Sequence, residues 1–236
     1  MISHPSPLIP YGIFVTGTDT SVGKTRVATA LLRAFARRGL RAVGMKPVAA
    51  GCERIDGALV SEDVAALAAA SNVTLPVDLI NPYRFQPAIA PHLAAELAGE
   101  TISLQRIGDA YVALAARADR VVVEGAGGFL VPLNGREDFG DLARLLELPV
   151  LLVVGMRLGC LNHALLTAEA VQRRGLQFAG WVANRLDATT PGFEQNVQTL
   201  CKRLDAPLLG IVPFAVSTTE AEASCLDLQV LENSFR

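Results

Sequence analysis

The sequence has few cysteines, and none of them is paired in the way that metal sites require. Cys52, Cys160, Cys201 and Cys225 each stand alone in the chain. Structural zinc sites use Cys and His residues in closely spaced pairs, and no such pair is present. We therefore expect free thiols in a reducing compartment rather than a zinc centre.

The chain also lacks long apolar runs and a concentration of positive charge. No segment reaches the ~18 apolar residues that a membrane-spanning helix needs, and residues 1–10, MISHPSPLIP, do not have the pattern of a secretory signal. The net charge is −2 and the Lys and Arg residues are dispersed, which disfavours nucleic acid as a partner. These absences predict a cytoplasmic protein that binds neither membrane nor nucleic acid, with residues 1–10 as a flexible leader.

The residues that are present are sufficient for one full hydrophobic core over residues 11–236. Of the 236 residues, 51% are hydrophobic and 19% are charged. Short apolar runs alternate with helical patterns, which predicts an α/β fold with a mainly parallel central sheet flanked by helices. The proline-rich stretch from Pro76 to Pro91 is interpreted as a simple connection. The expected strands are 12–16, 42–45, 120–123, 150–154, 178–183 and 208–212, and the expected helices are 25–38, 63–70, 104–118, 139–146, 163–174 and 192–204.

The first expected strand leads into GTDTSVGKT, residues 17–25, and then into the first expected helix. Backbone N–H groups in such a turn and the positive end of the helix bind phosphate. The usual motif has four residues between its glycines, whereas five separate Gly17 from Gly23. The motif is therefore a variant, but the strand before it and the helix after it are the required context. We expect Lys24 to contact the outer phosphates of a nucleotide and Thr25 to bind its magnesium, in a P-loop NTPase-like three-layer sandwich.

Two more candidates follow strands, and ligands of parallel sheets bind at the carboxyl ends of the strands. Lys46 precedes Pro47, which favours an extended backbone, and a second cation beside Lys24 would stabilise a transferring phosphoryl group; a solvated loop lysine is the alternative. Glu124 follows an apolar run and precedes GAGG. This position resembles a magnesium-coordinating acid of P-loop proteins, while a buried, hydrogen-bonded acid is the alternative.

Other polar residues have both a functional and a structural interpretation. Asp63 lies at a helix start, where the helix dipole favours an acid in any case. The helix start at residues 159–162 offers free N–H groups to a carboxylate, or Asn162 simply caps the helix. Cys160 has little support as a catalytic nucleophile, because no nearby acid is evident that would orient His163 as its base. Asn184 could hydrogen-bond a purine or cap a turn.

Seven short blocks, in this order and over nearly the whole chain, closely resemble the dethiobiotin synthetase family. They are GTDTSVGKT at 17–25, KPVA at 46–49, NPY at 81–83, PH at 91–92, VEGAGG at 123–128, LGCLNHA at 158–164 and GWVAN at 180–184. The ordered set is far more specific than any one block. The resemblance implies an ATP-dependent ligase of biotin biosynthesis. It would make dethiobiotin from 7,8-diaminononanoate and CO2 through a carbamate and a carbamic-phosphoric anhydride, releasing ADP and phosphate.

The resemblance also implies roles for individual residues. Magnesium would be held by Thr25, Asp63 and Glu124, and Lys24 and Lys46 would stabilise the γ-phosphate and the carbamate. Contacts to ATP would come from Ser21, Val22, Gly23, Lys24, Thr25, Arg26, Gly125, Ala126, Gly127, Asn184, Arg185, Pro213, Phe214, Ala215 and Glu220. The carboxylate of the diamine would bind Gly159, Cys160, Leu161 and Asn162 of a second subunit, which implies a homodimer with a shared active site. Two positions depart from the family, which commonly has a hydroxyl residue in place of Ala50 and often an acid in place of Ser21.

Two other classes of protein would share the expected fold. Dimeric ATPases of the partition or septum-placement type carry an additional lysine early in the phosphate turn, where this chain has Thr18 and Asp19. Cobyrinic acid amide-forming ligases append a glutaminase domain, and too few residues follow residue 212 for one. Both alternatives are therefore less favoured than a synthetase.

Overall fold

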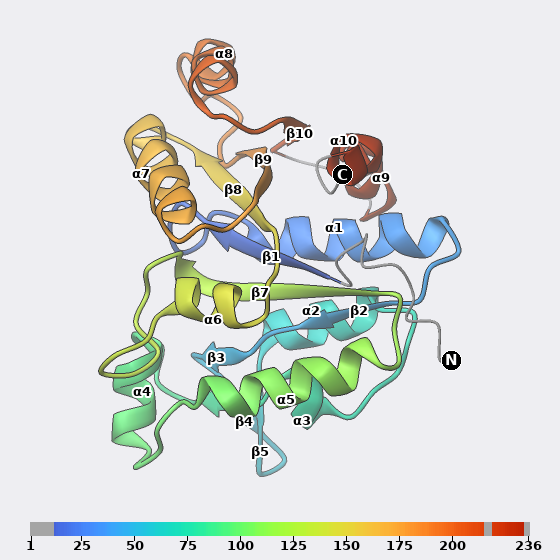
Figure 1. The fold of residues 1–236 in the computed structure, drawn as a ribbon, viewed down its shortest axis with the longest axis vertical. Coiled ribbons are helices and arrows are strands. Elements are labelled where there is room, and N and C mark those ends of the chain that lie inside the picture. Colours follow the sequence, from blue (N-terminus) through green and yellow to red (C-terminus); the bar gives the residue numbers. More distant parts are fainter. Residues whose placement is uncertain (1–11, 215–218, 234–236) are drawn as a thin grey trace, which may run out of the picture.

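Six parallel strands form the centre of the computed structural model, which describes residues 12–214 and 219–233 (Figure 1). Their order is β10-β9-β8-β1-β7-β2, and every neighbouring pair is parallel. All six expected strands are confirmed. They are β1 (Gly12–Gly17), β2 (Ala42–Met45), β7 (Arg120–Gly128), β8 (Val150–Met156), β9 (Phe178–Arg185) and β10 (Leu208–Val212).

Helices cover both faces of this sheet (Figure 1). In β1, Phe14 packs into the core on one face, whereas Ile13 and Val15 pack into the core on the other, as the alternation of side chains along a strand requires. The face of Phe14 is covered by α5 (Leu104–Ala115), α6 (Phe139–Leu145), α7 (Cys160–Arg173) and α8 (Phe193–Arg203). The other face is covered by α1 (Lys24–Arg37), α2 (Glu62–Ala70), α9 (Thr219–Ser224) and α10 (Leu228–Asn233). The predicted three-layer sandwich is confirmed.

The stretch from Pro76 to Pro91 is more ordered than a simple connection, so that prediction was wrong. It contains α3 (Val77–Ile80) and β6 (Tyr83–Phe85), and it ends where α4 (Pro91–Leu97) begins. β6 pairs in parallel with β3 (Val48–Ala50), and β4 (Glu53–Ile55) forms a hairpin with β5 (Ala58–Val60). The stretch is ordered because the side chains of Tyr83 and Phe85 are buried, in elements too short to show a clear hydrophobic period.

Two predicted boundaries shift in ways that matter for the site. β7 continues past Val123 to Gly128, so Glu124 lies inside the strand and pairs with Val15. Helix α7 begins at Cys160, and Gly159 takes the N-cap position with φ of 92°. Asn162 is therefore not the N-cap; it is the third residue of the helix.

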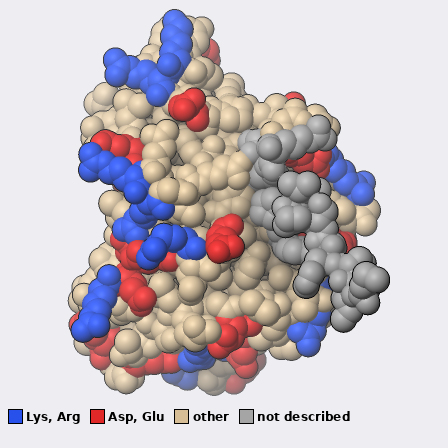
Figure 2. All heavy atoms as spheres, in the orientation of Figure 1, with Lys and Arg blue, Asp and Glu red and all other residues tan. Residues whose placement is uncertain are grey.

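The surface shows no field of one charge sign on the face drawn in Figure 2. Lys and Arg side chains alternate there with Asp and Glu side chains. Within the described residues, no helix combines the length and apolar character needed to cross a bilayer.

Candidate active site

The phosphate turn is built on two glycines that other residues could not replace. A Cβ atom at Gly17 would lie 2.6 Å from Cγ2 of Val22, and one at Gly23 would lie 2.2 Å from Nδ2 of Asn184. Gly23 also has φ of 93°, and Ser21 adopts φ of 58°. Helix α1 starts directly after Gly23 without a side-chain cap. Its first N–H groups are thus left for a ligand, as an anion site at a helix start requires.

Lys24 lies at the entrance of α1 with its side chain turned back over the turn. Its Nζ atom donates to the carbonyl oxygen of Asp19 at 2.9 Å, and the residue is buried. Burial and, next, the positive charge of Lys46 lower the pKa of Lys24 to about 8. Asp19 is held in turn by an ion pair with Arg157 from the loop after β8. The turn therefore presents a buried ammonium whose charge an incoming phosphate would stabilise.

Lys46, at the end of β2, lies between two carboxylates. Its Nζ atom is 2.7 Å from Oε1 of Glu124 and 2.8 Å from Oδ2 of Asp63. Burial disfavours the charge, but Glu124 and then Asp63 outweigh it and hold the pKa of Lys46 above its ordinary value. The backbone of Lys46 is fixed by Asn81, whose Nδ2 atom donates to the Lys46 carbonyl at 2.6 Å. The predicted convergence of Lys24, Lys46 and Glu124 on one cleft is observed.

The hydroxyl of Thr25 contacts the same two carboxylates, those of Asp63 and Glu124. This hydroxyl lies 2.7 Å from Oδ1 of Asp63 and 2.8 Å from Oε1 of Glu124, to which it donates. Burial opposes the charge of Asp63, but Lys46 holds the pKa of this carboxyl below its usual range. Burial raises the pKa of Glu124 against the opposing effect of Lys46. Asp63 is therefore more than an acid at a helix start, and the N-cap of α2 is Ser61.

These three oxygen-bearing side chains fit a magnesium ion. Glu124 is almost fully buried, and its Oε2 atom has no hydrogen-bond partner among the described residues. A buried carboxylate oxygen without a partner is costly unless a ligand satisfies it. Two carboxylates and a hydroxyl are a donor set that suits magnesium, which usually takes one or two carboxylates and completes its shell with phosphates and water.

A cleft of about 790 Å³ opens above these groups. Part of its wall is apolar. The family motifs had pointed to Ala49 and Pro91 and to the departure at Ala50, whereas the other apolar residues of the wall were not predicted, because small apolar side chains carry no chemical signal. Predicted residues on the wall are Ser21, Gly23, Lys24, Thr25, Arg26, Lys46, Asp63, Glu124, Ala126 and Gly127. The apolar wall consists of Ala49, Ala50, Ala88, Ile89, Ala90, Pro91 and Val131.

Asn184 lies directly behind the phosphate turn. Its Nδ2 atom donates to the Val22 carbonyl at 2.8 Å, and its Oδ1 atom accepts from Nη1 of Arg26 at 3.3 Å. Arg26 also pairs with Glu222 of α9 at 2.6 Å. Glu222 was not predicted as part of the site, because 196 positions separate it from Arg26.

The other residues predicted to contact the nucleotide lie at the ends of β9 and β10. Arg185 donates to Glu194 at 2.9 Å, and its guanidinium lies 3.8 Å from the centre of the Phe193 ring. Pro213 and Phe214 follow β10, whose last residue pairs with Asn184. Gly125 is buried in β7 and its carbonyl oxygen accepts from Lys46 at 3.3 Å. Ala215 lies outside the described residues, and so does the side chain of Glu220.

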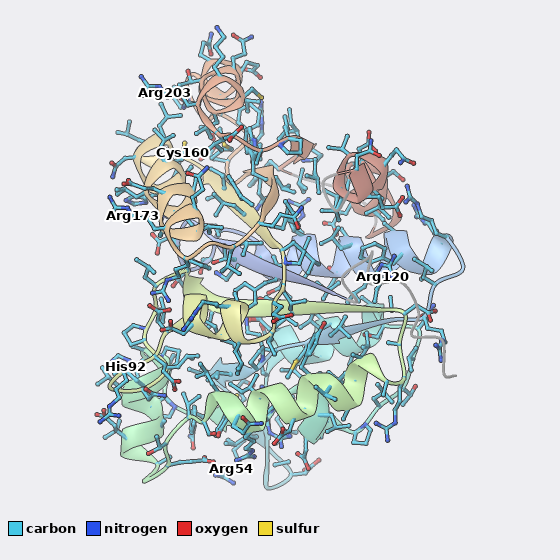
Figure 3. All side chains as sticks on the ribbon, viewed as in Figure 1. Arg54, His92, Arg120, Cys160, Arg173 and Arg203 are labelled. Atoms are coloured by element: carbon cyan, nitrogen blue, oxygen red, sulfur yellow. The ribbon has the colours of Figure 1, made fainter. Side chains whose placement is uncertain are left out.

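The predicted carboxylate site at the start of α7 does not line this cleft. Figure 3 labels Cys160 there, and its side chain is buried in the apolar core beneath α7 and α8. Asn162 is exposed, and Leu158, before the helix, is fully exposed. Within one chain, the start of α7 therefore does not share a cleft with Lys24 and Lys46.

Comparisons with known proteins agree on one family. The model of a family described as an AAA domain (AAA_26) matches residues 11–222. The chain is 59% identical over 203 residues to the ATP-dependent dethiobiotin synthetase BioD of Nitrosospira multiformis, which covers 86% of this chain and 88% of that protein. It is 52% identical over 215 residues to the protein of the same name from Aromatoleum aromaticum, covering 91% and 96%.

Solved structures share the fold at low sequence identity. A ParA family ATPase from Chlorobium tepidum superposes with a TM-score of 0.56 at 13% identity, over 96% of this chain and 97% of that one. The septum site-determining protein MinD from Pyrococcus horikoshii, in complex with Mg-ADP, gives 0.52 at 14% identity, over 95% and 94%. At this identity, the likeness supports the P-loop NTPase fold alone.

Proposed function

Because this chain belongs to the ATP-dependent dethiobiotin synthetase family, we propose that the cleft around Lys24, Lys46 and Glu124 is where its reaction takes place. The chain is an ATP-dependent ligase of biotin biosynthesis. It carboxylates 7,8-diaminononanoate with CO2 and closes the ring of dethiobiotin. The observation that carries the location is the convergence of two buried ammonium groups with a phosphate turn and a partly unpaired buried carboxylate.

The reaction needs positioning and charge stabilisation more than an activated protein nucleophile. An amine of the substrate adds to CO2 and loses a proton, which gives a carbamate. A carbamate oxygen then attacks the γ-phosphorus of ATP, and the bond from that phosphorus to ADP breaks. The second amine attacks the carbamate carbon of this anhydride, the bond to the phosphate oxygen breaks, and the ring closes with release of phosphate.

In this mechanism, Lys24 and Lys46 stabilise the negative charge that builds up on the transferring group. The turn from Ser21 to Arg26 binds the phosphates through its N–H groups, and the side-chain amide of Asn184 contacts the adenine. Thr25, Asp63 and Glu124 would hold magnesium, which supplies positive charge to the phosphate oxygens. Lys46 is bound to Asp63 and Glu124, so its ammonium is already beside the carboxylates when ATP arrives.

We extend the proposal to a homodimer whose active sites are shared. The start of α7 has no side-chain cap and carries the exposed Asn162, yet it does not line the cleft of its own chain. A partner's α7 would place its first N–H groups and Asn162 beside the cleft and bind the carboxylate of the diamine. A cytoplasmic location also remains a prediction.

The alternative considered from the sequence, a dimeric ATPase of the partition or septum-placement type in which hydrolysis times partner binding, shares the fold with this chain but not the family. The two functions differ in what drives phosphate release. A synthetase requires the diamine and bicarbonate, whereas such an ATPase responds to a protein partner or to lipid.

The direct test is incorporation of labelled bicarbonate into 7,8-diaminononanoate, with and without ATP and magnesium. We expect labelled dethiobiotin only when all components are present. ATP hydrolysis at the same rate without the diamine would overturn the proposal.

A further inference from the structure

A chain of three contacts joins helix α9 to the phosphate turn. Glu222 accepts from Nε of Arg26 at 2.6 Å, and Nη1 of Arg26 donates to Oδ1 of Asn184 at 3.3 Å. Asn184 then donates from Nδ2 to the Val22 carbonyl at 2.8 Å. The side chains of Arg26 and Glu222 are 22% and 14% exposed, so the ion pair is protected from much of the solvent and its screening.

The chemistry of these groups fixes the direction in which the Asn184 amide points. A guanidinium has only donors, so the atom of Asn184 that faces Arg26 must be the oxygen. The NH2 group then faces the Val22 carbonyl and keeps one hydrogen for another acceptor. Arg26 can hold the amide only while its own long side chain is held, and Glu222 supplies that restraint.

We propose that Glu222 is a positioning residue of the nucleotide site, which acts through Arg26 to orient the Asn184 amide. This inference rests on the proposed function, in which Asn184 meets the adenine. A preorganised amide loses less conformational freedom when the base binds, and it favours one pattern of donors and acceptors on the base. Loss of Glu222 should therefore weaken ATP binding and reduce the preference for adenine over guanine, without slowing phosphoryl transfer at saturating ATP.

A second ion pair provides a matched control. Arg38, just past the other end of α1, pairs with Glu232 of α10 at 2.5 Å. Both pairs attach C-terminal helices to α1, but only the pair of Arg26 continues to Asn184. An effect of helix attachment alone would appear in both variants, whereas an effect on base recognition would appear only at Glu222.

The experiment compares Glu222→Ala with Glu232→Ala by calorimetric titration with ATP and GTP. We expect Glu222→Ala to lower the affinity for ATP about fivefold to tenfold. The affinity for GTP should fall by a factor several-fold smaller than that. We expect Glu232→Ala to bind both nucleotides like the unmodified protein. In steady-state assays, Glu222→Ala should raise the KM for ATP, with kcat and the diamine KM within about twofold.

Two further results separate positioning from structure. In the Asn184→Ala background, Glu222→Ala should cost less than about twofold in ATP affinity, because the amide that it orients is absent. Equal losses in Glu222→Ala and Glu232→Ala, or unchanged ATP affinity in Glu222→Ala, would overturn the inference. If Glu222→Ala does not fold, Glu222→Gln decides in its place, with a predicted ATP loss of about twofold to threefold. The titrations need no turnover, so a failed carboxylation assay would overturn the proposed function and leave this result standing.

Discussion

The Nζ atom of Lys46 lies 2.7 Å from Oε1 of Glu124, and the two side chains are 4% and 1% exposed. Removing both charges from water is costly, and their attraction roughly offsets that cost. Such a pair is therefore weak evidence for stability. The proposed function explains the pair better, because ATP, magnesium and the carbamate would bring charge into the cleft.

Replacing Lys46 separates its contribution to catalysis from its contribution to stability. Lys46→Ala should lower kcat by about two orders of magnitude or more, because the lost charge acts mainly on the transition state. ATP binding should remain measurable. The same change leaves Glu124 without its ammonium partner, so the free energy of unfolding should fall by about 3 kcal/mol. Turnover at saturating substrates, ATP titration and urea denaturation measure the three effects.

Arg41→Ala is the control for that variant. Arg41 pairs with Asp119 at 2.8 Å on the surface, where its side chain is 61% exposed, so this change should alter neither turnover nor stability appreciably. Unmodified turnover in Lys46→Ala would remove Lys46 from the mechanism.

Glu124 is the residue through which the magnesium assignment can be tested. Glu124→Gln keeps an oxygen that can accept from Thr25 and Lys46, but it removes the negative charge that a divalent ion needs. The magnesium concentration for half-maximal turnover should rise about tenfold or more, whereas ATP binding in the absence of magnesium should change little. A magnesium titration with an unchanged midpoint would show that Glu124 does not hold the ion.

Much of the fold could be predicted because the strands are short apolar runs flanked by recognisable helices. The run at residues 150–154 is buried on both faces, as its unbroken apolar character indicates. β3 and β6 could not be predicted, because three-residue strands show no period and depend on tertiary contacts such as those of the Asn81 amide.

The candidate site, like the fold, could be predicted from the sequence only in part. Lys24, Thr25 and Glu124 follow from local rules, since a phosphate turn carries the first two and Glu124 directly follows a short apolar run. Asp63 needed the family resemblance, because an acid at a helix start has a sufficient local explanation. Glu222 had no signal of either kind, since its role depends on a contact with Arg26 from the other end of the chain.

The lowered pKa of Lys24 predicts a proton effect on ATP binding. Above about pH 8 this side chain is largely neutral in the nucleotide-free protein. Phosphates beside it favour the charged form, so ATP binding at pH 9 should take up protons, and binding at pH 6.5 should take up almost none at this residue. Calorimetry in two buffers of different ionisation enthalpy measures the uptake. Lys24→Met should abolish it, and equal uptake in that variant would assign the proton to another group.

The same shift has a consequence for stability in the absence of nucleotide. The pKa of Lys24 falls from 10.5 to about 8 on folding, so between these values the unfolded chain holds more protons than the folded protein. The cost of burying the charge is present in full below about pH 8 and disappears as the pH rises toward 10.5. Relative to Lys24→Met, the unmodified protein should therefore gain stability over this range in urea denaturation. A constant difference between the two would contradict the lowered pKa.

The proposal that the active site is shared between two subunits can be tested by mixing two inactive variants. Lys46→Ala removes a charge from the cleft, and Asn162→Asp puts a negative charge beside the proposed carboxylate site on α7. If each site combines the cleft of one chain with α7 of the other, a mixed dimer contains one site with neither change. Random mixing should then restore about a quarter of the unmodified turnover, since half of the dimers are mixed and each has one intact site.

Asn162→Ala tests the carboxylate site itself in a single chain type, because it should raise the diamine KM more than the ATP KM. Only the mixture distinguishes a shared site from a site within one chain. Were both groups to serve a site within one chain, a mixed dimer would hold only sites with one change each, and mixing would restore nothing. Subunits must exchange for the test to work, which a size-tagged chain recovered in mixed dimers would verify. Activity that stays at the level of the separate variants in such verified mixtures would exclude a site shared between subunits.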